Sequence, residues 1–421
     1  MENLIPYIKL IILALACLVT GVCTLNRKWY VNLPVFLICI AGETFMAYLF
    51  FPAYALWPAC GSVAIFAFST AWEHLKPSGR KENKSPIRLP VISGVPYRHL
   101  EFYYYYSNFL VYGGAGSGKT KSIGKWLLEE YIRLGFAGFI YDFKDVDYTQ
   151  TAYNLTKKYG YPHKFYYVSF DKPERSYRFN PLKVVKDRTE LMQLMEDVLL
   201  ALLPKGEKQN EWVAGGLGIL RGVAFRFWDE FPEYCTLPHI MAFIMTASTR
   251  QLSIFLQQNL VAEMMAGAYL KAEGSEKTQA SYLSTLCNNL STISQNEEIA
   301  YILSGDDFDF NLIDPEDPKL FAISNNFSKN SVYAPVIGML MSISTRQFTM
   351  QNKVPFVYFL DEMTTVNIKN FETLPSVLRE YKVGFVLLTQ SGAKLEALYG
   401  KLDRSSVEAN FGIQFFGRSE E

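Results

Sequence analysis

Gly113-Gly114-Ala115-Gly116-Ser117-Gly118-Lys119-Thr120 fits the pattern G-x-x-x-x-G-K-[ST] at every specified position. It follows the apolar run Phe109–Tyr112, which predicts a buried strand, and it precedes a predicted helix over 121–134. The glycines let the backbone curl into a cradle of N–H groups, and the helix adds its positive N-terminal end. An ordinary Gly/Ser turn is the alternative. The phosphate-binding candidates are Gly113, Gly114, Ala115, Gly116, Ser117, Gly118, Lys119, Thr120 and Lys121.

The chemistry expected of this loop is the binding of ATP with Mg²⁺. Lys119 is expected to reach the β- and γ-phosphates, and the Thr120 hydroxyl is expected to hold the metal ion. Much later in the chain, the apolar run 354–360 ends in Asp361-Glu362. Asp361 is expected to hold the magnesium shell through water, and Glu362 to polarise the attacking water as general base. An apolar strand before Asp-Glu is a weak signal alone, but here a complete phosphate loop stands upstream.

Two further residues are candidates for catalysis. The apolar run Val383–Leu388 predicts a buried strand, and it is followed by Gln390, whose amide could contact the γ-phosphate or its water. Arg379 precedes this strand, and in a ring it could reach the γ-phosphate of a neighbouring copy and stabilise charge there. The alternatives are a polar strand end for Gln390 and a surface ion pair for Arg379.

A second buried strand, predicted over 137–141, leads into charged residues. Asp142 and Lys144 follow it directly. Ligands of open α/β sheets bind at the carboxyl ends of the strands, so both are secondary site candidates. A charged turn without a role in binding is the alternative.

The N-terminal region of the chain is apolar enough to predict membrane helices. Three stretches, 4–25, 31–51 and 53–71, approach the length of about 20 residues that a span needs. A two-span arrangement, with some of the last two stretches re-entrant or periplasmic, remains open. Basic residues at 27–28 and over 76–88 predict an outer N-terminus and a cytoplasmic location for everything after about residue 72.

The composition limits the classes of partner and the redox chemistry. The 41 basic residues balance the 41 acidic ones, so overall charge indicates no polyanion partner, and contacts with nucleic acid require local patches. The 6 cysteines form no C-x-x-C pair, which indicates reduced, packed thiols without a disulfide framework or a zinc site.

The pattern of residues divides the chain into five regions. The basic stretch 73–98 is either a solvated linker or a segment that binds anionic lipid headgroups. The aromatic run 102–106 predicts a strand, with stacking on nucleic-acid bases as the alternative. Helical periodicity from 184 predicts an all-α insertion, with a helix cap at Asp187 and a helix over 251–270. Its 8 basic and 14 acidic residues over 187–300 favour a protein partner over DNA. The expected regions are 1–72 (two or three transmembrane helices), 73–98 (linker), 99–183 (the first segment of the nucleotide-binding domain), 184–304 (all-α insertion) and 305–421 (the second segment of the nucleotide-binding domain).

The expected fold class is therefore α/β: a RecA-like P-loop ATPase domain with an inserted all-α domain and N-terminal transmembrane helices. The arrangement resembles the type IV coupling proteins of conjugative DNA transfer and type IV secretion, which are additional-strand P-loop ATPases. The resemblance covers roughly 100–418. The residues that carry it are Tyr112–Thr120, Tyr141–Lys144, Phe179–Leu182, Phe359–Glu362, Leu388–Ser391 and Leu395–Gly400.

The resemblance implies a function and a set of partners. Members of that family are hexamers that hydrolyse ATP and have a central channel for single-stranded DNA linked to a relaxase or another relaxosome protein. The resemblance further implies contacts with type IV secretion channel components and a place in the bacterial inner membrane, with the ATPase domain in the cytoplasm. A pump for protein substrates alone and an ATP-gated membrane assembly scaffold with little turnover are the alternatives.

The chain also departs from the family pattern. The usual Asp-x-Lys-Gly-Glu is Asp142-Phe143-Lys144-Asp145-Val146 here, so a role for the glycine and the acid does not transfer. The external domain often found between the spans is essentially missing. Relatives usually run on beyond the strand expected near residue 416, so the final element of the family is expected to be absent or truncated.

Overall fold

The computed structural model describes residues 29–50, 52, 60, 63, 86–91, 99–144, 146–203, 210–349 and 352–417. The chain divides into two units, Met1–Lys84 and Ser85–Glu421. The first unit contains the 22-residue helix α2 (Trp29–Phe50), which coincides with the second of the three expected spans.

Of the described helices, none combines the length and the apolar character needed to cross a membrane. The first expected span lies outside the described residues, and so does the third apart from Cys60 and Val63. The number of membrane spans therefore remains a prediction.

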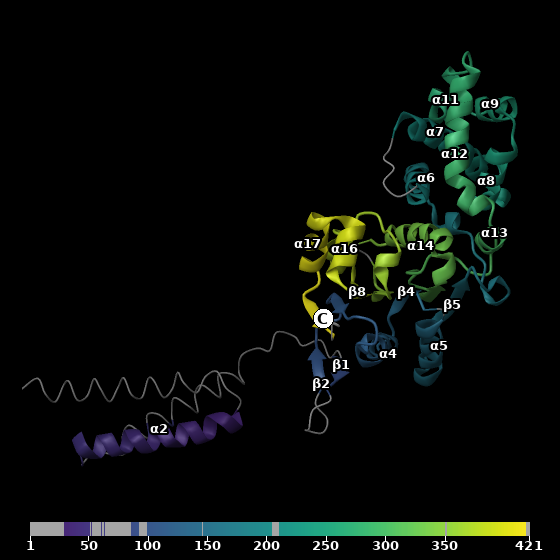
Figure 1. Ribbon diagram of the computed structural model, residues 1–421. Helices are drawn as coiled ribbons and strands as arrows, with labels where there is room; N and C mark the ends of the chain where they lie inside the picture. Colours follow the sequence, from purple (N-terminus) through teal and green to yellow (C-terminus); the bar gives the residue numbers. More distant parts are fainter. Residues whose placement is uncertain are drawn as a thin grey trace, which may run out of the picture. The chain divides into compact units, whose positions relative to one another are not determined.

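The second unit is built on a seven-stranded sheet in which every neighbouring pair of strands is parallel (Figure 1). The strands run in the order β5-β6-β4-β7-β8-β3-β9. All of the carboxyl ends consequently lie along one edge of the sheet, where α/β proteins bind ligands. The strands are β3 (Phe109–Tyr112), β4 (Ala137–Asp142), β5 (Lys164–Ser169), β6 (Lys319–Ser324), β7 (Phe356–Leu360), β8 (Val383–Thr389) and β9 (Ile413–Phe416).

Helices cover both faces of the sheet, which is why its inner strands are buried, mainly apolar runs without polar alternation, whereas burial alternates along the edge strand β9. In β3, Phe109 and Val111 pack with α4 (Lys125–Arg133) and α5 (Asp147–Tyr159) on one face. Leu110 and Tyr112 belong to the larger core on the opposite face. That face carries α14 (Asn330–Thr345), α16 (Gly392–Tyr399) and α17 (Lys401–Ala409).

The expected helical insertion is present between β5 and β6. Its first helix begins at a cap predicted from the sequence, because the Asp187 side chain accepts the N–H of Glu190. Figure 1 shows these helices extending away from the side of the sheet that α14 covers. They are α6 (Arg188–Leu202), α7 (Glu211–Glu230), α8 (Leu237–Thr246), α9 (Thr249–Gln257), α10 (Leu260–Met265), α11 (Gly267–Lys271), α12 (Glu276–Ser294) and α13 (Glu297–Leu303).

One expected helix of the insertion is interrupted. The stretch 251–270, predicted as continuous, divides into α9, α10 and α11. The reason is local, because the Asn259 side chain accepts the N–H groups of Val261 and Ala262 and so starts a new helix.

The tyrosine run was wrongly predicted as a strand over its whole length. Strand β2 (His99–Phe102) ends at the first residue of the run, and Ser107 donates its N–H to the Tyr104 carbonyl in the following turn. Strand β2 pairs antiparallel with β1 (Ile87–Pro90), which lies inside the expected linker. The Arg88 N–H donates to Glu130 of α4 at 2.7 Å, so this end of the expected linker is attached to the unit that contains the seven-stranded sheet.

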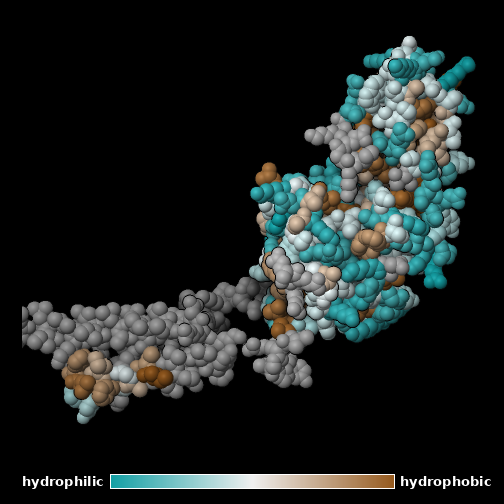
Figure 2. Space-filling view, viewed as in Figure 1, coloured by the Kyte–Doolittle hydropathy of each residue, from teal (hydrophilic) through white to brown (hydrophobic). Residues whose placement is uncertain are grey.

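The surface of this unit is mainly hydrophilic on the side shown in Figure 2. Apolar patches interrupt it over the insertion helices and beside the C-terminal helices. Isolated apolar residues are normal on protein surfaces, so these patches assign no function by themselves.

Candidate functional site

The glycine-rich loop leaves β3 and enters one turn of π-helix (Thr120–Gly124) that continues as α4. Gly116 and Gly118 have φ angles of 74° and 81°. These left-handed conformations are accessible mainly to glycine. At Gly113, a Cβ atom would collide with the Ser117 hydroxyl. The motif therefore forms the curled backbone that the sequence predicts.

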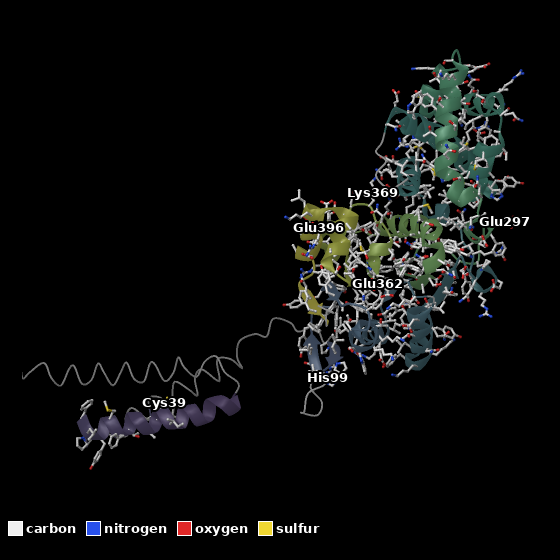
Figure 3. The ribbon with its side chains drawn as sticks, in the orientation of Figure 1. Cys39, His99, Glu297, Glu362, Lys369 and Glu396 are labelled. Atoms are coloured by element: carbon white, nitrogen blue, oxygen red, sulfur yellow. The ribbon has the colours of Figure 1, made fainter. Side chains whose placement is uncertain are left out.

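Lys119 and Glu362 form a buried ion pair. Lys119 Nζ lies 2.6 Å from Glu362 Oε1, and the two side chains are 5% and 4% exposed. Glu362 has a φ of 44°, an uncommon value for a residue with a side chain and one that tends to occur at functional sites. The sharp turn after β7 thus places the expected general base beside the loop lysine. Figure 3 labels Glu362 at its place among the elements of the sheet.

Asp361 has a carboxylate that is buried without a polar partner. Its side chain is fully buried, and neither carboxylate oxygen accepts a hydrogen bond from the described residues. Burial raises the pKa of Asp361 to about 7, with Glu362 and Asp142 adding to the rise and Lys144 opposing it. A buried carboxylate that lacks donors is chemically suited to a cation or a bound water.

The two secondary candidates, Asp142 and Lys144, differ in burial and in their contacts. The Asp142 carboxylate is fully buried and accepts the N–H groups of Thr149 at 2.8 Å and Lys144 at 3.3 Å. Asp142 therefore holds the beginning of α5, a structural role that the sequence reasoning did not foresee. Lys144 is exposed, and its charge acts on Asp361.

Two hydroxyl groups near the loop lack hydrogen-bond partners among the described residues. They belong to Ser117, inside the loop, and to Thr389, at the carboxyl end of β8. The Thr389 carbonyl accepts the N–H of Gly113 at 3.2 Å, so this strand end lies against the start of the loop. Thr389 was missed as a site residue, although a polar residue that ends a buried apolar strand was a usable signal.

Gln390 and Arg379 lie at opposite edges of the sheet. Gln390 is exposed, accepts a hydrogen bond from Lys394, and lines a cavity of about 420 Å³ together with Gly113 and Gly114. Arg379 is exposed and lines a different cavity with Asn108, the residue before β3. Gln390 therefore lies beside the glycine-rich loop of its own chain, whereas Arg379 lies away from that loop.

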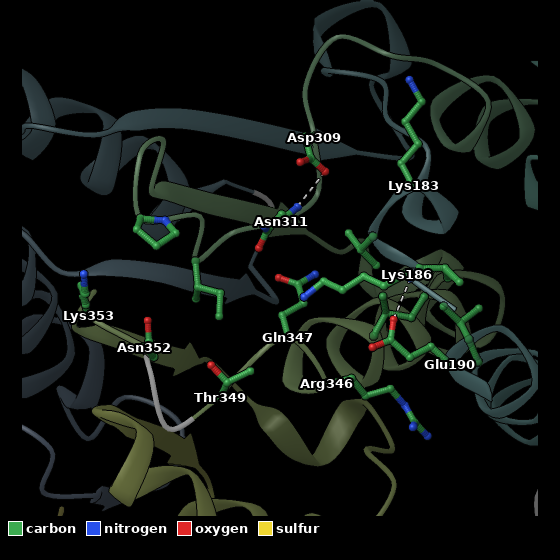
Figure 4. A pocket seen from close by; sticks show the side chains of 16 residues that line it. Lys183, Lys186, Glu190, Asp309, Asn311, Arg346, Gln347, Thr349, Asn352 and Lys353 are labelled. Atoms are coloured by element: carbon green, nitrogen blue, oxygen red, sulfur yellow. Dashed lines mark hydrogen bonds between the residues drawn. The ribbon is translucent and has the colours of Figure 1, made fainter. Parts of the chain in front are cut away.

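A further cavity, of about 420 Å³, lies at the base of the insertion. Figure 4 shows polar side chains around it, among them Lys186 and Glu190 near α6 and Lys353 ahead of β7. Its walls come from the start of the insertion and from the segments that precede β6 and β7, so it lies at the edge opposite the carboxyl ends. It contains none of the expected site residues.

These features define a class of protein: a P-loop α/β fold in which the loop, an acid pair and a polar strand end meet at one edge of a parallel sheet. Residues 78–421 match the family described as type IV secretory system conjugative DNA transfer. The chain therefore belongs to this family, as the sequence motifs predicted. No curated protein matches the chain.

Solved structures show the same fold. The chain resembles the bacterial conjugative coupling protein TrwBdeltaN70 in complex with sulphate, with a TM-score of 0.57 and 18% identity over 73% of this chain and 69% of that one. TrwB in complex with the GTP analogue GDPNP gives a TM-score of 0.56 at 19% identity, covering 72% and 68%. TrwB in complex with ADP and Mg²⁺ gives 0.55 at 19% identity, again covering 72% and 68%.

Proposed function

We propose that this protein is a membrane-anchored ATPase of conjugation. It couples ATP hydrolysis to the movement of DNA, or of a relaxase–DNA conjugate, into a type IV secretion channel. The observation that carries the proposal is the meeting of Lys119, Asp361 and Glu362 beside the glycine-rich loop. Membership of the conjugative DNA transfer family supports the substrate and the transport system.

The residues present fit a magnesium nucleotide. No group of three or more His, Cys, Asp or Glu side chains that could hold a metal ion occurs among the described residues, and Mg²⁺ typically needs only one or two carboxylates in addition to phosphate oxygens. Asp361, with both oxygens unpartnered, and Thr120 would hold it. When bound, the metal ion neutralises charge on the phosphate oxygens. TrwB in complex with ADP and Mg²⁺ supports this assignment.

The side chains of this chain have separable tasks. Lys119 binds the negative charge of the terminal phosphates, together with the N–H groups of the loop. Glu362 accepts the proton of the attacking water, and for this its Oε1 must leave Lys119 Nζ, which it contacts in the present structure. Gln390 orients the water or the γ-phosphate from the end of β8. When phosphate binds, Lys119 thus exchanges the Glu362 carboxylate for a phosphate oxygen. Glu362 is then free to act as the base.

Arg379 is proposed to act on a neighbouring copy. It is exposed and lies at the edge opposite its own phosphate loop, so its own site is out of reach. In a ring of six copies, it would approach the γ-phosphate of the next one. Catalysis would then depend on assembly.

The apolar N-terminal region and the basic residues that follow it support a location in the bacterial inner membrane, with the ATPase unit in the cytoplasm. Its proposed partners are single-stranded DNA, a relaxase or another relaxosome protein, and components of the type IV secretion channel. The acidic balance of the insertion favours that element as a site for a protein partner.

The test is ATP hydrolysis by the solubilised full-length protein with and without single-stranded DNA, read beside the assembled mass. We expect DNA to raise turnover, the mass to correspond to a hexamer, and Lys119→Ala to abolish both hydrolysis and conjugative transfer. Turnover that ignores DNA would favour a pump for proteins, and turnover no higher than that of Glu362→Gln would favour a scaffold. Hydrolysis and transfer that survive in Lys119→Ala would refute the site.

A further inference from the structure

A continuous series of hydrogen bonds begins at the turn after β7 that carries Glu362. It crosses the carboxyl edge of the sheet and ends at Asn325. The Thr365 hydroxyl donates to the Glu362 carbonyl at 2.7 Å. The Tyr141 hydroxyl lies 2.7 Å from the Thr365 hydroxyl oxygen, and Asn325 Nδ2 donates to the Tyr141 hydroxyl at 2.9 Å. Three strand ends, those of β7, β4 and β6, are joined in this way.

The direction of the chain follows from proton counting. A hydroxyl has one proton to donate, and Thr365 uses its proton on the Glu362 carbonyl. Tyr141 must therefore donate to Thr365 and accept from Asn325. Each group in the chain is satisfied, and buried networks of this kind hold a single arrangement because an unmatched member is costly. We name this Asn325–Tyr141–Thr365 set the hydroxyl relay.

The far end of the relay fixes a short exposed turn. The Asn325 carboxamide oxygen accepts the N–H of Asn326, which begins the turn of 3₁₀ helix over Phe327–Lys329. Asn326 and Lys329 both donate to Asp171, at 3.0 and 2.6 Å. The backbone of this turn is therefore held at both ends.

The side chain of Phe327, in the turn, points outward. Phe327 is 80% exposed and makes an edge-to-face contact with Phe143 at 6.3 Å between ring centroids. Lys144 follows Phe143 and forms no salt bridge in the described part of the chain. The turn thus offers an open aromatic face beside Phe143, which the exposed Lys144 follows directly, at the same edge of the sheet as the phosphate loop.

We propose that Phe327 stacks on a base of single-stranded nucleic acid, and that the hydroxyl relay couples this contact to Glu362. The inference rests on the proposed function, and it names residues that contact the strand and the path to the catalytic turn. An open aromatic ring near a cation without a salt bridge among the described residues, here Phe327 and Lys144, is an arrangement that binds single strands without sequence preference. A strand that displaces the turn moves Asn325, and through Tyr141 and Thr365 it shifts the turn that carries Glu362.

The contact is tested by the binding of a fluorescein-labelled oligothymidine to the full-length protein, read by anisotropy. Phe327→Ala is expected to weaken binding by about tenfold, within the range found when stacking aromatics are removed, whereas Phe327→Tyr keeps the ring and the affinity. Tyr104→Ala is the matched control, because Tyr104 is 77% exposed and lies beside the cavity at the opposite edge. Equal affinities for Phe327→Ala and the parent would overturn the contact.

The relay is tested by the ratio of DNA-stimulated to basal turnover. Tyr141→Phe removes one hydroxyl, yet Thr365 still donates to Glu362 and Asn325 still donates to Asn330 at 2.7 Å, so the fold is kept. We expect the ratio to fall to about one while oligothymidine affinity stays within twofold. Tyr358→Phe is the control, because that hydroxyl is equally buried but pairs with Ser344 at 2.8 Å outside the relay.

The outcomes separate this inference from the proposed function. A parent protein that neither binds oligothymidine nor responds to it would overturn both. A parent that responds, with Tyr141→Phe retaining the full ratio, would overturn the relay alone. Loss of assembled mass in Phe327→Ala would assign the ring to an interface between copies and would overturn the nucleic-acid contact.

Discussion

The buried charges at the end of β7 place function and stability in conflict. Asp361 ionises in a site that offers its carboxylate no donor among the described residues, and the Glu362 carboxylate is stabilised by its contact with Lys119 at 2.6 Å. Both buried carboxylates lower the stability of the protein without ligand. Both are suited to a site that binds a cation and phosphates. Such residues are expected to become more favourable when ligand binds.

The carboxyl group of Asp361 should make the empty protein less stable as pH rises. In the unfolded chain the group loses its proton near 3.8, but in the folded chain it keeps the proton until about 7, so stability falls between these values and is constant above them. The shift corresponds to at most about 4 kcal/mol. Asp361→Asn should therefore raise the thermal midpoint at pH 8, and the difference should shrink as pH falls towards 4.

The same variant should lose its response to ligand. Magnesium and ATP should raise the thermal midpoint of the parent at pH 8 more than that of Asp361→Asn, which keeps Lys119 and the loop N–H groups but loses a ligand of the metal ion. A lower midpoint for Asp361→Asn at pH 8 without ligand would contradict the assignment of a buried, unpartnered carboxylate.

Removing Lys119 should destabilise the protein even without nucleotide. Lys119→Ala leaves Glu362 buried without its cation, and breaking a buried pair from one side typically costs about 3–5 kcal/mol. Adding Glu362→Gln removes the unpaired buried charge and should recover some of the lost free energy of unfolding. Denaturant unfolding of the parent, both single variants and the double variant measures the coupling, and additive single effects would show that the pair is not formed in solution.

At the scale of elements, the helix after the phosphate loop approaches its neighbours closely. A Cβ atom on Gly124 would collide with the Tyr148 hydroxyl of α5 and would lie 2.9 Å from Leu388 of β8. A glycine at this point lets the π-turn pass between α5 and the sheet. The loop and its helix are consequently positioned by packing as well as by the motif.

Gly124→Ala should destabilise the protein by about 1–3 kcal/mol through overpacking. Adding Tyr148→Phe removes the nearest atom and should recover much of the loss. Gly267→Ala is the control, because Gly267 is a helical glycine with nothing within 4 Å of its Cβ position, and it should be neutral or slightly stabilising. Equal urea midpoints for Gly124→Ala and the parent would show that the helix shifts freely.

Helices and strands could be predicted from the sequence where the hydrophobic periodicity and a sequence motif indicate the same element. The strand before Gly113, the helix after Thr120 and the apolar strand before Asp361 combine periodicity with a motif, and each occurs as expected. The tyrosine run and the stretch 251–270 were misread because a local turn and the Asn259 cap interrupt otherwise suitable patterns.

The contacts between distant residues were not predictable in the same way. Thr389 beside Gly113 and Tyr141 beside Thr365 depend on the order of strands in the sheet. No spacing in the chain records that order. The motifs therefore predict Lys119, Asp361 and Glu362 as site residues, but they do not predict the hydroxyl relay that runs from the Glu362 carbonyl to Asn325.

At the scale of the whole unit, one carboxylate attaches the insertion to the ATPase sheet. Asp197 of α6 is 4% exposed and accepts hydrogen bonds from Arg346, after α14, and from Lys369, in the segment that follows the acid pair. Both cations lie on the sheet side of the contact, and Figure 3 shows Lys369 between the C-terminal helices and the insertion. A partner that binds the insertion can thus act on the segment after Glu362.

Asp197→Ala should weaken this attachment. The loss of charged hydrogen bonds is expected to lower the free energy of unfolding by about 1.5–3 kcal/mol, because Arg346 and Lys369 are partly exposed and regain water. Limited proteolysis should cut the segment between α14 and β7 faster in this variant. Glu196→Ala is the control on the same helix, since its pair with Arg221 is more exposed and should contribute less than about 1 kcal/mol.

The central claim is that the acid pair beside Lys119 hydrolyses ATP. Its most direct test is steady-state phosphate release by assembled Glu362→Gln with saturating ATP and Mg²⁺, measured beside equilibrium ATP binding. The account predicts that binding is retained and that turnover falls by about a hundredfold or more, as loss of a general base requires. Turnover in Glu362→Gln equal to that of the parent would contradict it.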